Sequence, residues 1–105
     1  SILMKAGIRK DIKGIDRFIF ENGLDNSKLH MHISEVAPNQ SMHAPHQHEG
    51  QEICCVFSGK GEVLFGDQTH VLKKNHAILV DCQIIHGIRN VGDVPLRYAV
   101  IIAKL

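Results

Sequence analysis

Two histidines and two glutamates occur close together in the segment His-Gln-His-Glu-Gly-Gln-Glu, residues 46–52. Residues two apart on a β-strand share a face, so His46 and His48 would project together. If residues 49–51 form a hairpin loop, Glu52 starts the returning strand opposite His48, with Cβ atoms roughly 5 Å apart. Two imidazoles and a carboxylate would then converge, and a divalent transition metal binds such a mixture of nitrogen and oxygen donors.

The same segment has a second interpretation, which is a hydrophilic hairpin tip whose polar side chains simply face water. The segment alone does not separate the two interpretations, so residues elsewhere must decide. Histidine is unusually frequent in this chain, with eight copies, whereas Trp is absent and Tyr occurs once.

Short runs rich in Val, Ile, Leu and Phe make up most of the chain, and Gly, Asn or Asp separate them. This pattern predicts an all-β fold, either a sandwich or a closed barrel. The expected strands are residues 17–21, 29–36, 52–57, 61–65, 69–73, 77–80, 87–90 and 96–103. Residues 10–15 are expected to form a short turn of helix. No linker divides the chain, so we expect a single domain over residues 1–105.

The strand expected at residues 29–36 alternates apolar and polar side chains. Alternation is typical of a strand with one buried face, which Leu29, Met31 and Ile33 would form. His30 and His32 would then point to solvent or to a subunit interface rather than toward a metal.

Two motifs carry a resemblance to the cupin family. His46-x-His48-x3-Glu52-x6-Gly59 resembles the first cupin motif, and His86-x3-Asn90 resembles the end of the second. The short spacing between them is similar to that of small microbial cupins, and the resemblance extends from about residue 36 to residue 102. It implies a double-stranded β-helix, or jelly-roll barrel, with a metal inside its mouth. The implied ligands are His46, His48, Glu52 and His86, with Asn90 in a structural role.

This sequence departs from the usual second motif, G-x5-P-x-G-x2-H, at three positions, which hold Asn75, Asp81 and Gln83. Gln40 also replaces the glycine that usually begins the first motif. Asn tolerates the left-handed conformation that Gly adopts, and Asp favours turns. A glutamine held at positive φ would be strained, or the loop would follow another path and shift His86.

Two further residues are candidates for catalysis. His43 would lie at the barrel mouth and move protons or contact substrate, although a surface histidine is the alternative. Tyr98 shares a face with apolar residues of the last strand, so it would either direct its hydroxyl into the cavity or belong to the core. Candidate apolar lining residues are Met42, Cys54, Phe57, Phe65 and Ile84. His70 and His76 are expected on the surface, without a chemical role.

Composition excludes several classes of protein. Twelve basic and eleven acidic residues give a formal charge of +1, which leaves no strong field to attract nucleic acid. No apolar run approaches the length of a membrane span, and the first residues lack the pattern of a secretion signal, so a cytoplasmic location is expected. Cys54, Cys55 and Cys82 form neither a disulfide framework nor a CxxC motif, and we expect reduced, mostly buried thiols.

The resemblance implies two classes of function. The first is a metal-dependent enzyme of dioxygenase, isomerase or lyase type that acts on a small, polar, oxygen-rich metabolite. The alternative is a non-catalytic module that binds a metal or a small ligand as a sensor or store. Iron, manganese, nickel, zinc and copper all suit three imidazoles and a carboxylate. A homodimer is also expected, through apolar strands that include residues 96–102.

Overall fold

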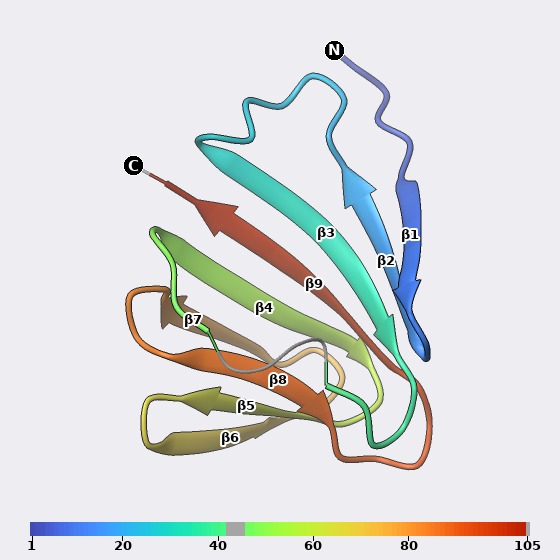
Figure 1. Cartoon of the computed structure of the whole chain (residues 1–105), viewed down its shortest axis with the longest axis vertical. Helices are drawn as coiled ribbons and strands as arrows, with labels where there is room; N and C mark the ends of the chain where they lie inside the picture. The colour runs from blue at the N-terminus through green and yellow to red at the C-terminus, as the bar shows by residue number, and fades with distance from the viewer. Residues whose placement is uncertain (42–45, 105) are drawn as a thin grey trace.

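The structure is a computed structural model that describes residues 1–41 and 46–104, without the side chain of Asp11. The described ranges contain strands and no helix, so the all-β prediction is confirmed. The strands are β1 (Gly7–Ile12), β2 (Ile15–Phe20), β3 (Leu29–Val36), β4 (Gln51–Ser58), β5 (Gly61–Phe65), β6 (Gln68–Leu72), β7 (Ala77–Asp81), β8 (His86–Asn90) and β9 (Leu96–Ala103). They form a six-stranded sheet, β1-β2-β3-β9-β4-β7, and a three-stranded sheet, β6-β5-β8 (Figure 1).

The N-terminal hairpin differs from the prediction. Residues 10–15 were expected to form a helical turn, and that prediction is wrong, because residues 10–12 belong to β1, residues 13 and 14 form the turn, and Ile15 begins β2. Ile12 pairs with Ile15 across the turn, and Gly14 adopts a φ of 83° there. A glycine reaches this conformation without steric cost, which allows the chain to reverse and β1 to pair with β2.

The buried face of β3 is opposite to the predicted one. Ser34 is 0% exposed, whereas Leu29 is 41% exposed. His32 pairs with Ile19 on one side and with Val100 on the other, and these two apolar residues are both buried. His30 and His32 therefore share the inward face with Ser34 and not the solvent face. Alternation identified the strand correctly, but the polarity of the two faces gave the wrong orientation.

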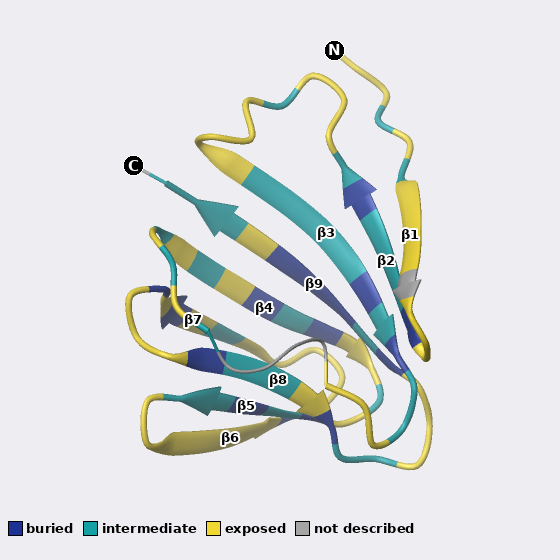
Figure 2. Cartoon of the chain, in the orientation of Figure 1, coloured by how far each residue is buried: buried dark blue, intermediate teal, exposed yellow. Residues whose placement is uncertain are grey.

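The hydrophobic core lies between the inner faces of the two sheets. It comprises Ile15, Val36, Cys54, Val56, Val63, Leu72, Leu96, Tyr98 and Val100. Buried and more exposed positions alternate along β4, as expected for a strand that packs on one face only (Figure 2). Burial of these side chains is the main favourable contribution to folding.

Gly59 and Asn90, two residues of the cupin-like motifs, stabilise the turns that follow β4 and β8. Gly59 has a φ of 86°, and a Cβ there would lie 2.6 Å from the carbonyl oxygen of Pro95. Asn90 is buried, and its side-chain nitrogen donates hydrogen bonds to the carbonyls of Val36 and Val94, at 2.9 and 2.8 Å. Its side-chain oxygen accepts one from the Gly92 amide. Asn90 thus has a structural role.

The chain-terminal strand β9 lies between β3 and β4, with hydrogen-bonded partners on both sides. Another chain cannot pair with its edge, so residues 96–102 cannot mediate dimerisation by edge pairing. The edges of the large sheet are β1 and β7. Within the described ranges, no helix has the length and hydropathy needed to cross a bilayer.

Candidate metal centre

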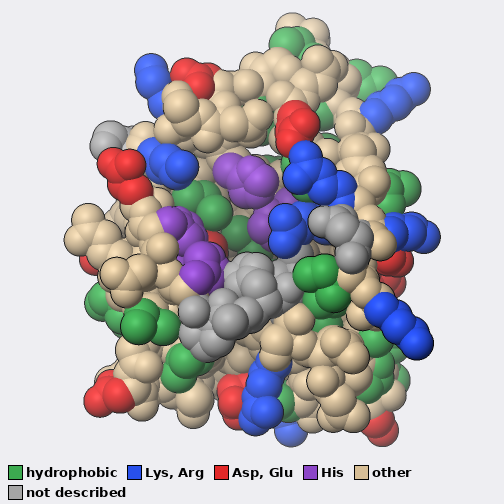
Figure 3. All heavy atoms as spheres, in the orientation of Figure 1, with side chains coloured by type: hydrophobic (Ala, Val, Ile, Leu, Met, Phe, Trp, Pro, Cys, Tyr) green, Lys and Arg blue, Asp and Glu red, His purple; other side chains and the backbone are tan. Residues whose placement is uncertain are grey.

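A cavity of about 130 Å³ opens between the two sheets. Its lining combines polar side chains with an apolar floor. The lining residues are Arg17, His32, His46, His48, Glu52, Cys54, Val63, Val80, His86, Gly87, Ile88, Tyr98, Val100 and Ile102. Figure 3 shows two groups of histidine side chains on this face, with hydrophobic side chains visible between them. All four residues that the cupin resemblance implied as ligands line this cavity.

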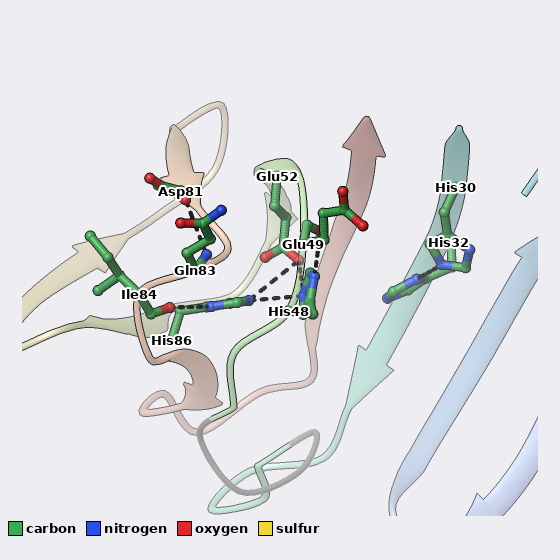
Figure 4. A network of polar contacts seen from close by, with 9 residues as sticks. All are labelled: His30, His32, His48, Glu49, Glu52, Asp81, Gln83, Ile84 and His86. Atoms are coloured by element: carbon green, nitrogen blue, oxygen red, sulfur yellow. Dashed lines mark hydrogen bonds and ion pairs between the residues drawn. The ribbon is translucent and has the colours of Figure 1, made fainter. Parts of the chain in front are cut away.

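His48, Glu52 and His86 converge at one side of the cavity. The Nε2 atoms of His48 and His86 lie 3.2 Å apart. The Oε1 atom of Glu52 lies 3.9 Å from Nε2 of His48 and 3.8 Å from Nε2 of His86. Figure 4 shows the two imidazoles pointing toward each other, with the carboxylate beside them. Residues distant in the sequence thus direct three donor atoms at a common point.

Backbone carbonyls orient both imidazoles of this cluster. Nδ1 of His86 lies 2.8 Å from the carbonyl oxygen of Ile84, and Nδ1 of His48 lies 3.0 Å from that of Glu49. A carbonyl only accepts, so each Nδ1 carries the proton that it donates. In the neutral imidazoles, both Nε2 atoms then present lone pairs to each other and to the Glu52 carboxylate.

Lone pairs in this arrangement repel one another unless a cation lies between them. Two nitrogen ligands of one metal ion, each at about 2.0–2.1 Å, are separated by roughly 2.9–3.4 Å for bond angles between 90° and 109°. The observed 3.2 Å between the two Nε2 atoms falls in this range. A hydrogen bond from the ligand's second ring nitrogen to a carbonyl is also typical of metal-binding histidines. The residues present therefore fit a divalent transition metal.

His46 lies beside this cluster, but it is not among the residues whose ligand atoms lie within 4.8 Å of one another, so its role as a ligand stays a prediction. Its ring centroid lies 4.9 Å from that of His48 and 4.6 Å from that of His86. The backbones of His46 and His86 exchange two hydrogen bonds of 2.9 Å, which form an isolated bridge beside β8. This bridge, rather than a strand that ends in a hairpin with β4, places His46 at the cavity. The predicted pairing of His48 opposite Glu52 in a ladder is wrong, although the two side chains do meet.

The loop before His86 follows a path that avoids the expected strain. Asn75 has a φ of 68°, so asparagine does occupy the left-handed position that the motif gives to glycine. Gln83 is not among the non-glycine residues with positive φ in the described chain. Its backbone amide donates to the Asp81 side chain at 3.0 Å. Asp81 thus forms the turn in place of the usual proline and glycine, and His86 still reaches the cluster.

Cys82 is a member of the cluster that the sequence did not predict. Ligand atoms of His48, Glu52, Cys82 and His86 all lie within 4.8 Å of one another. Two hydrogen bonds tie its backbone to the neighbouring loop, one from the His48 amide and one to the Gly50 carbonyl. Burial, reinforced by the charge of Glu52, raises the pKa of the Cys82 thiol to about 11. No pattern in the sequence distinguished Cys82 from the other two cysteines, because tertiary proximity alone places it in the cluster.

The two predicted catalytic residues have different outcomes. His43 lies outside the described residues, so its role stays a prediction. Tyr98 is 1% exposed and lines the cavity. Burial raises the pKa of its hydroxyl, and a hydrogen bond with the Ser34 side chain acts in the opposite direction. The hydroxyl is therefore protonated at neutral pH.

The opposite wall of the cavity carries polar residues that sequence reasoning placed elsewhere. His32 lines the cavity, and its Nδ1 lies 2.7 Å from Nε2 of His30. Arg17 on β2 also lines it. Strand β9 separates β3 from β4, and Figure 4 shows His30 and His32 across β9 from the His48–His86 cluster.

The remaining candidates divide between the cavity and the surface. Cys54 lines the cavity as predicted, whereas Phe57 and Ile84 are exposed and Phe65 does not line it. Met42 lies outside the described residues. The histidines at positions 70 and 76 are exposed, as predicted.

Known structures share this fold at low sequence identity. AerE from Microcystis aeruginosa superposes with a TM-score of 0.84 at 20% identity, over 97% of this chain and 47% of that one. An oxalate decarboxylase from Lactobacillus farciminis, in a formate complex, gives 0.79 at 16%, over 94% and 31%. The cupin domain of an XRE family transcriptional regulator from Enterobacter cloacae gives 0.77 at 17%, over 89% and 99%. These similarities confirm the predicted cupin fold.

The sequence of this chain assigns it to a family. Comparison with curated proteins gave no match. The family model described as "Cupin domain" matches residues 32–102, which include both motifs and every described member of the metal cluster. This chain therefore belongs to the cupin domain family.

Proposed function

We propose that this protein binds one divalent transition metal ion through His46, His48, Glu52 and His86, and that it is a metal-dependent enzyme acting on a small, oxygen-rich metabolite. One observation carries the proposal, which is the convergence of imidazole nitrogens and a carboxylate oxygen at one side of a lined cavity. Cys82 lies close enough to be an additional or alternative ligand.

The imidazole and carboxylate ligands are compatible with several divalent metals and do not select one element. Imidazole and carboxylate donors suit iron, manganese, nickel, zinc and copper. Such an ion, when bound, supplies Lewis acidity toward a carbonyl, enol or similar oxygen of the substrate. That chemistry is compatible with dioxygenase, isomerase and lyase reactions.

Side chains of the cavity would position the substrate and hold protons. Tyr98 presents a protonated hydroxyl at the apolar floor, where it can donate a hydrogen bond to a substrate oxygen. His43 is the second proposed proton carrier. The cavity volume is about 130 Å³, which favours a small substrate.

A non-catalytic ligand sensor or store is the alternative function. The cupin domain of the Enterobacter cloacae transcriptional regulator has the same fold and nearly the same extent as this chain. The two functions differ in measurable behaviour. An enzyme converts its substrate in a metal-dependent manner that chelation abolishes, whereas a sensor is stabilised by its ligand and forms no product.

The metal site can be tested by elemental analysis of protein purified without an affinity tag. Because His48 directs Nε2 at the cluster, His48→Ala should lower metal content by at least roughly tenfold. His70→Ala removes an exposed imidazole on β6 and should leave the content unchanged. Cys82→Ser tests whether Cys82 belongs to the ligand set. It should lower the metal content only if the thiol binds the metal. Equal metal in the His48 and His70 variants would show that the ligand set is wrong.

A homodimer is the second part of the proposal, and the outer face of the large sheet supports it. Strand pairing places two rows of uncharged side chains on this face, beside a row that contains Asp16, Glu35 and Arg97. One row is Ile8, Phe18, Ile33, Ala99, Cys55 and Ala77, and the other is Phe20, Met31, Ile101, Ile53 and Leu79. Several of these residues are exposed. A second copy can pack on these two rows about a two-fold axis without burying like charges.

A further inference from the structure

Arg17 differs from the other arginines of this chain. Arg9, Arg89 and Arg97 form ion pairs with Glu21, Glu62 and Glu35, at 3.6, 3.1 and 3.4 Å. Arg17 has no carboxylate within ion-pairing distance among the residues that the structure describes. The sequence contains no further arginine. The one arginine that lines the cavity is thus the one whose charge no described protein carboxylate neutralises at close range.

The strand register directs Arg17 into the cavity. Arg17 pairs with Ser34, which is 0% exposed on the inner face of β3. Phe18, the next residue, therefore points to the outer face, where the Arg97 guanidinium lies 5.5 Å from its ring centroid. Arg17 is half-buried, so its guanidinium is partly shielded from water. Shielding strengthens the attraction between a guanidinium and an anion.

His32 adds a second polar group to the same wall. It lines the cavity beside Arg17 and contacts His30 at 2.7 Å. Burial lowers the pKa of His30, and the positive charge of Arg17 lowers it further. Arg17 is therefore close enough for its charge to act on this histidine pair. In Figure 3, lysine or arginine side chains adjoin one of the two histidine groups around the hollow.

We propose that Arg17 and His32 form an anion subsite, which binds the carboxylate of a small oxo or hydroxy acid whose remaining oxygens face the His48–Glu52–His86 cluster. This assignment rests on the proposed function for the role of the cluster. A guanidinium binds a carboxylate through two parallel hydrogen bonds, which fix orientation as well as position. Glu52 repels a carboxylate on the other side of the cavity, so the two walls together orient the acid in one direction.

The cavity has room for a small acid. Pyruvate, with three carbons, is a suitable probe for a volume of about 130 Å³. Pyruvate and its amide, pyruvamide, have almost the same shape and differ in charge. Malonate, which has a carboxylate at each end, and its diamide, malonamide, provide a second pair. These pairs separate recognition of the carboxylate charge from recognition of shape.

The test is calorimetric titration of the four compounds into wild type, Arg17→Gln and Arg17→Lys, both metal-free and loaded with Zn²⁺. Wild type should bind at least one acid more tightly than its amide. Arg17→Gln should weaken binding of that acid roughly 10- to 100-fold, the loss expected for a charge-assisted hydrogen bond, and change amide binding by less than about threefold. Arg17→Lys keeps the positive charge but not the planar guanidinium that donates two parallel hydrogen bonds. Its affinity for the acid should therefore lie between those of wild type and Arg17→Gln.

Arg89→Gln is the matched control, because it removes the same charge from the exposed surface of β8, where Arg89 forms an ion pair with Glu62. Its ligand affinities should equal those of wild type. Thermal unfolding of each variant verifies that the fold is retained. The proposal is wrong if wild type prefers neither acid over its amide, or if Arg17→Gln weakens acid and amide equally.

Affinity for Zn²⁺, measured separately, distinguishes the two proposals. If wild type does not bind Zn²⁺, the proposed metal function fails, while the acid preference of the metal-free protein still decides the role of Arg17. If Zn²⁺ binds without any acid preference, the metal function stands and the anion subsite fails. Arg17→Gln should leave Zn²⁺ affinity unchanged. If the variant lost affinity for Zn²⁺ and for the acid together, Arg17 would only maintain the structure of the cavity.

Discussion

The two faces of the six-stranded sheet follow the usual rule for a β protein only in part. The outer face carries two rows of side chains without a charge, and Ile53 and Leu79 on it are 44% and 63% exposed. The inner face includes Arg17, His32 and Glu52 along the cavity. The interior of this fold is apolar in its core and polar at its mouth, so polarity alone does not reveal which face of a strand points inward.

This contrast has a physical basis in what each face contacts. Inner polar groups are retained where hydrogen bonds and a cavity satisfy them, as with the imidazoles of His48 and His86 on backbone carbonyls. Outer apolar groups remain in contact with water unless another surface covers them. We therefore interpret the outer face as a surface for association and the inner face as a surface for chemistry.

Breaking the outer face should have the largest effect. Ile53→Lys places an ammonium group in the centre of the apolar rows, and a two-fold axis would bury it twice. Because burial of an unpaired charge is costly, self-association should weaken at least roughly 100-fold. Sedimentation velocity over a range of concentrations measures this. Val71→Lys on β6 is the control on the other sheet and should not change association. A wild-type protein that is monomeric at all concentrations would contradict the dimer.

Truncation of one leucine on each face sharpens the comparison. Leu96 is 0% exposed on the inner face, so Leu96→Ala should lower the free energy of unfolding by about 2–5 kcal/mol. Leu79→Ala on the outer face should change it by less than about 0.5 kcal/mol. Urea unfolding in the Ile53→Lys background removes any contribution from a second copy. Similar losses for both leucines would mean that the outer face is as well packed as the core.

Alkaline pH should reveal a smaller effect from the inner face. Burial, followed by the charge of Glu52, raises the pKa of the Cys54 thiol from 9.0 to about 12. Above pH 9 the thiol loses its proton in the unfolded protein but keeps it in the folded protein, which favours unfolding. The contribution of the Cys54 thiol to the free energy of unfolding is therefore complete below pH 9 and is lost between pH 9 and about 12. At about pH 10, the loss is roughly 1 kcal/mol.

Cys54→Ala removes that titration, so the stability gap between wild type and variant should narrow by about 1 kcal/mol from about pH 7.5 to about pH 10. Urea unfolding at both pH values provides the measurement. Val56→Ala, a buried position on the same strand without a titratable group, should show a constant gap. A constant gap for Cys54→Ala would show that the thiol is not shielded from water in the folded protein.

Most strands could be predicted because their signals are local. The bounds of β3, β5 and β9 agree with the prediction, since alternating or continuous apolar runs bounded by turn residues specify extended segments. β1 was missed, because its sequence of glycine and charged residues resembles a loop or a helical turn. Its pairing with β2 depends on a single glycine conformation at the turn.

The candidate site was predicted only where a motif spans it. His46, His48, Glu52 and His86 could be named because their spacing resembles a known pattern, and all four line one cavity. Cys82 could not be selected among three cysteines, since its place in the cluster depends on backbone bonds to residues 48 and 50. No sequence pattern marks Arg17 or His32 as lining residues.

The sequence by itself determined the extended segments and the turns between them, because each depends on side-chain type at short range, and its resemblance to the cupin motifs named four candidate ligands. Only the tertiary structure decided which face of β3 points inward, that β9 has neighbours on both sides, and that Arg17 faces the cavity. The reason is geometric. A strand has two equivalent faces, and only its register against distant strands determines which of them encloses the site.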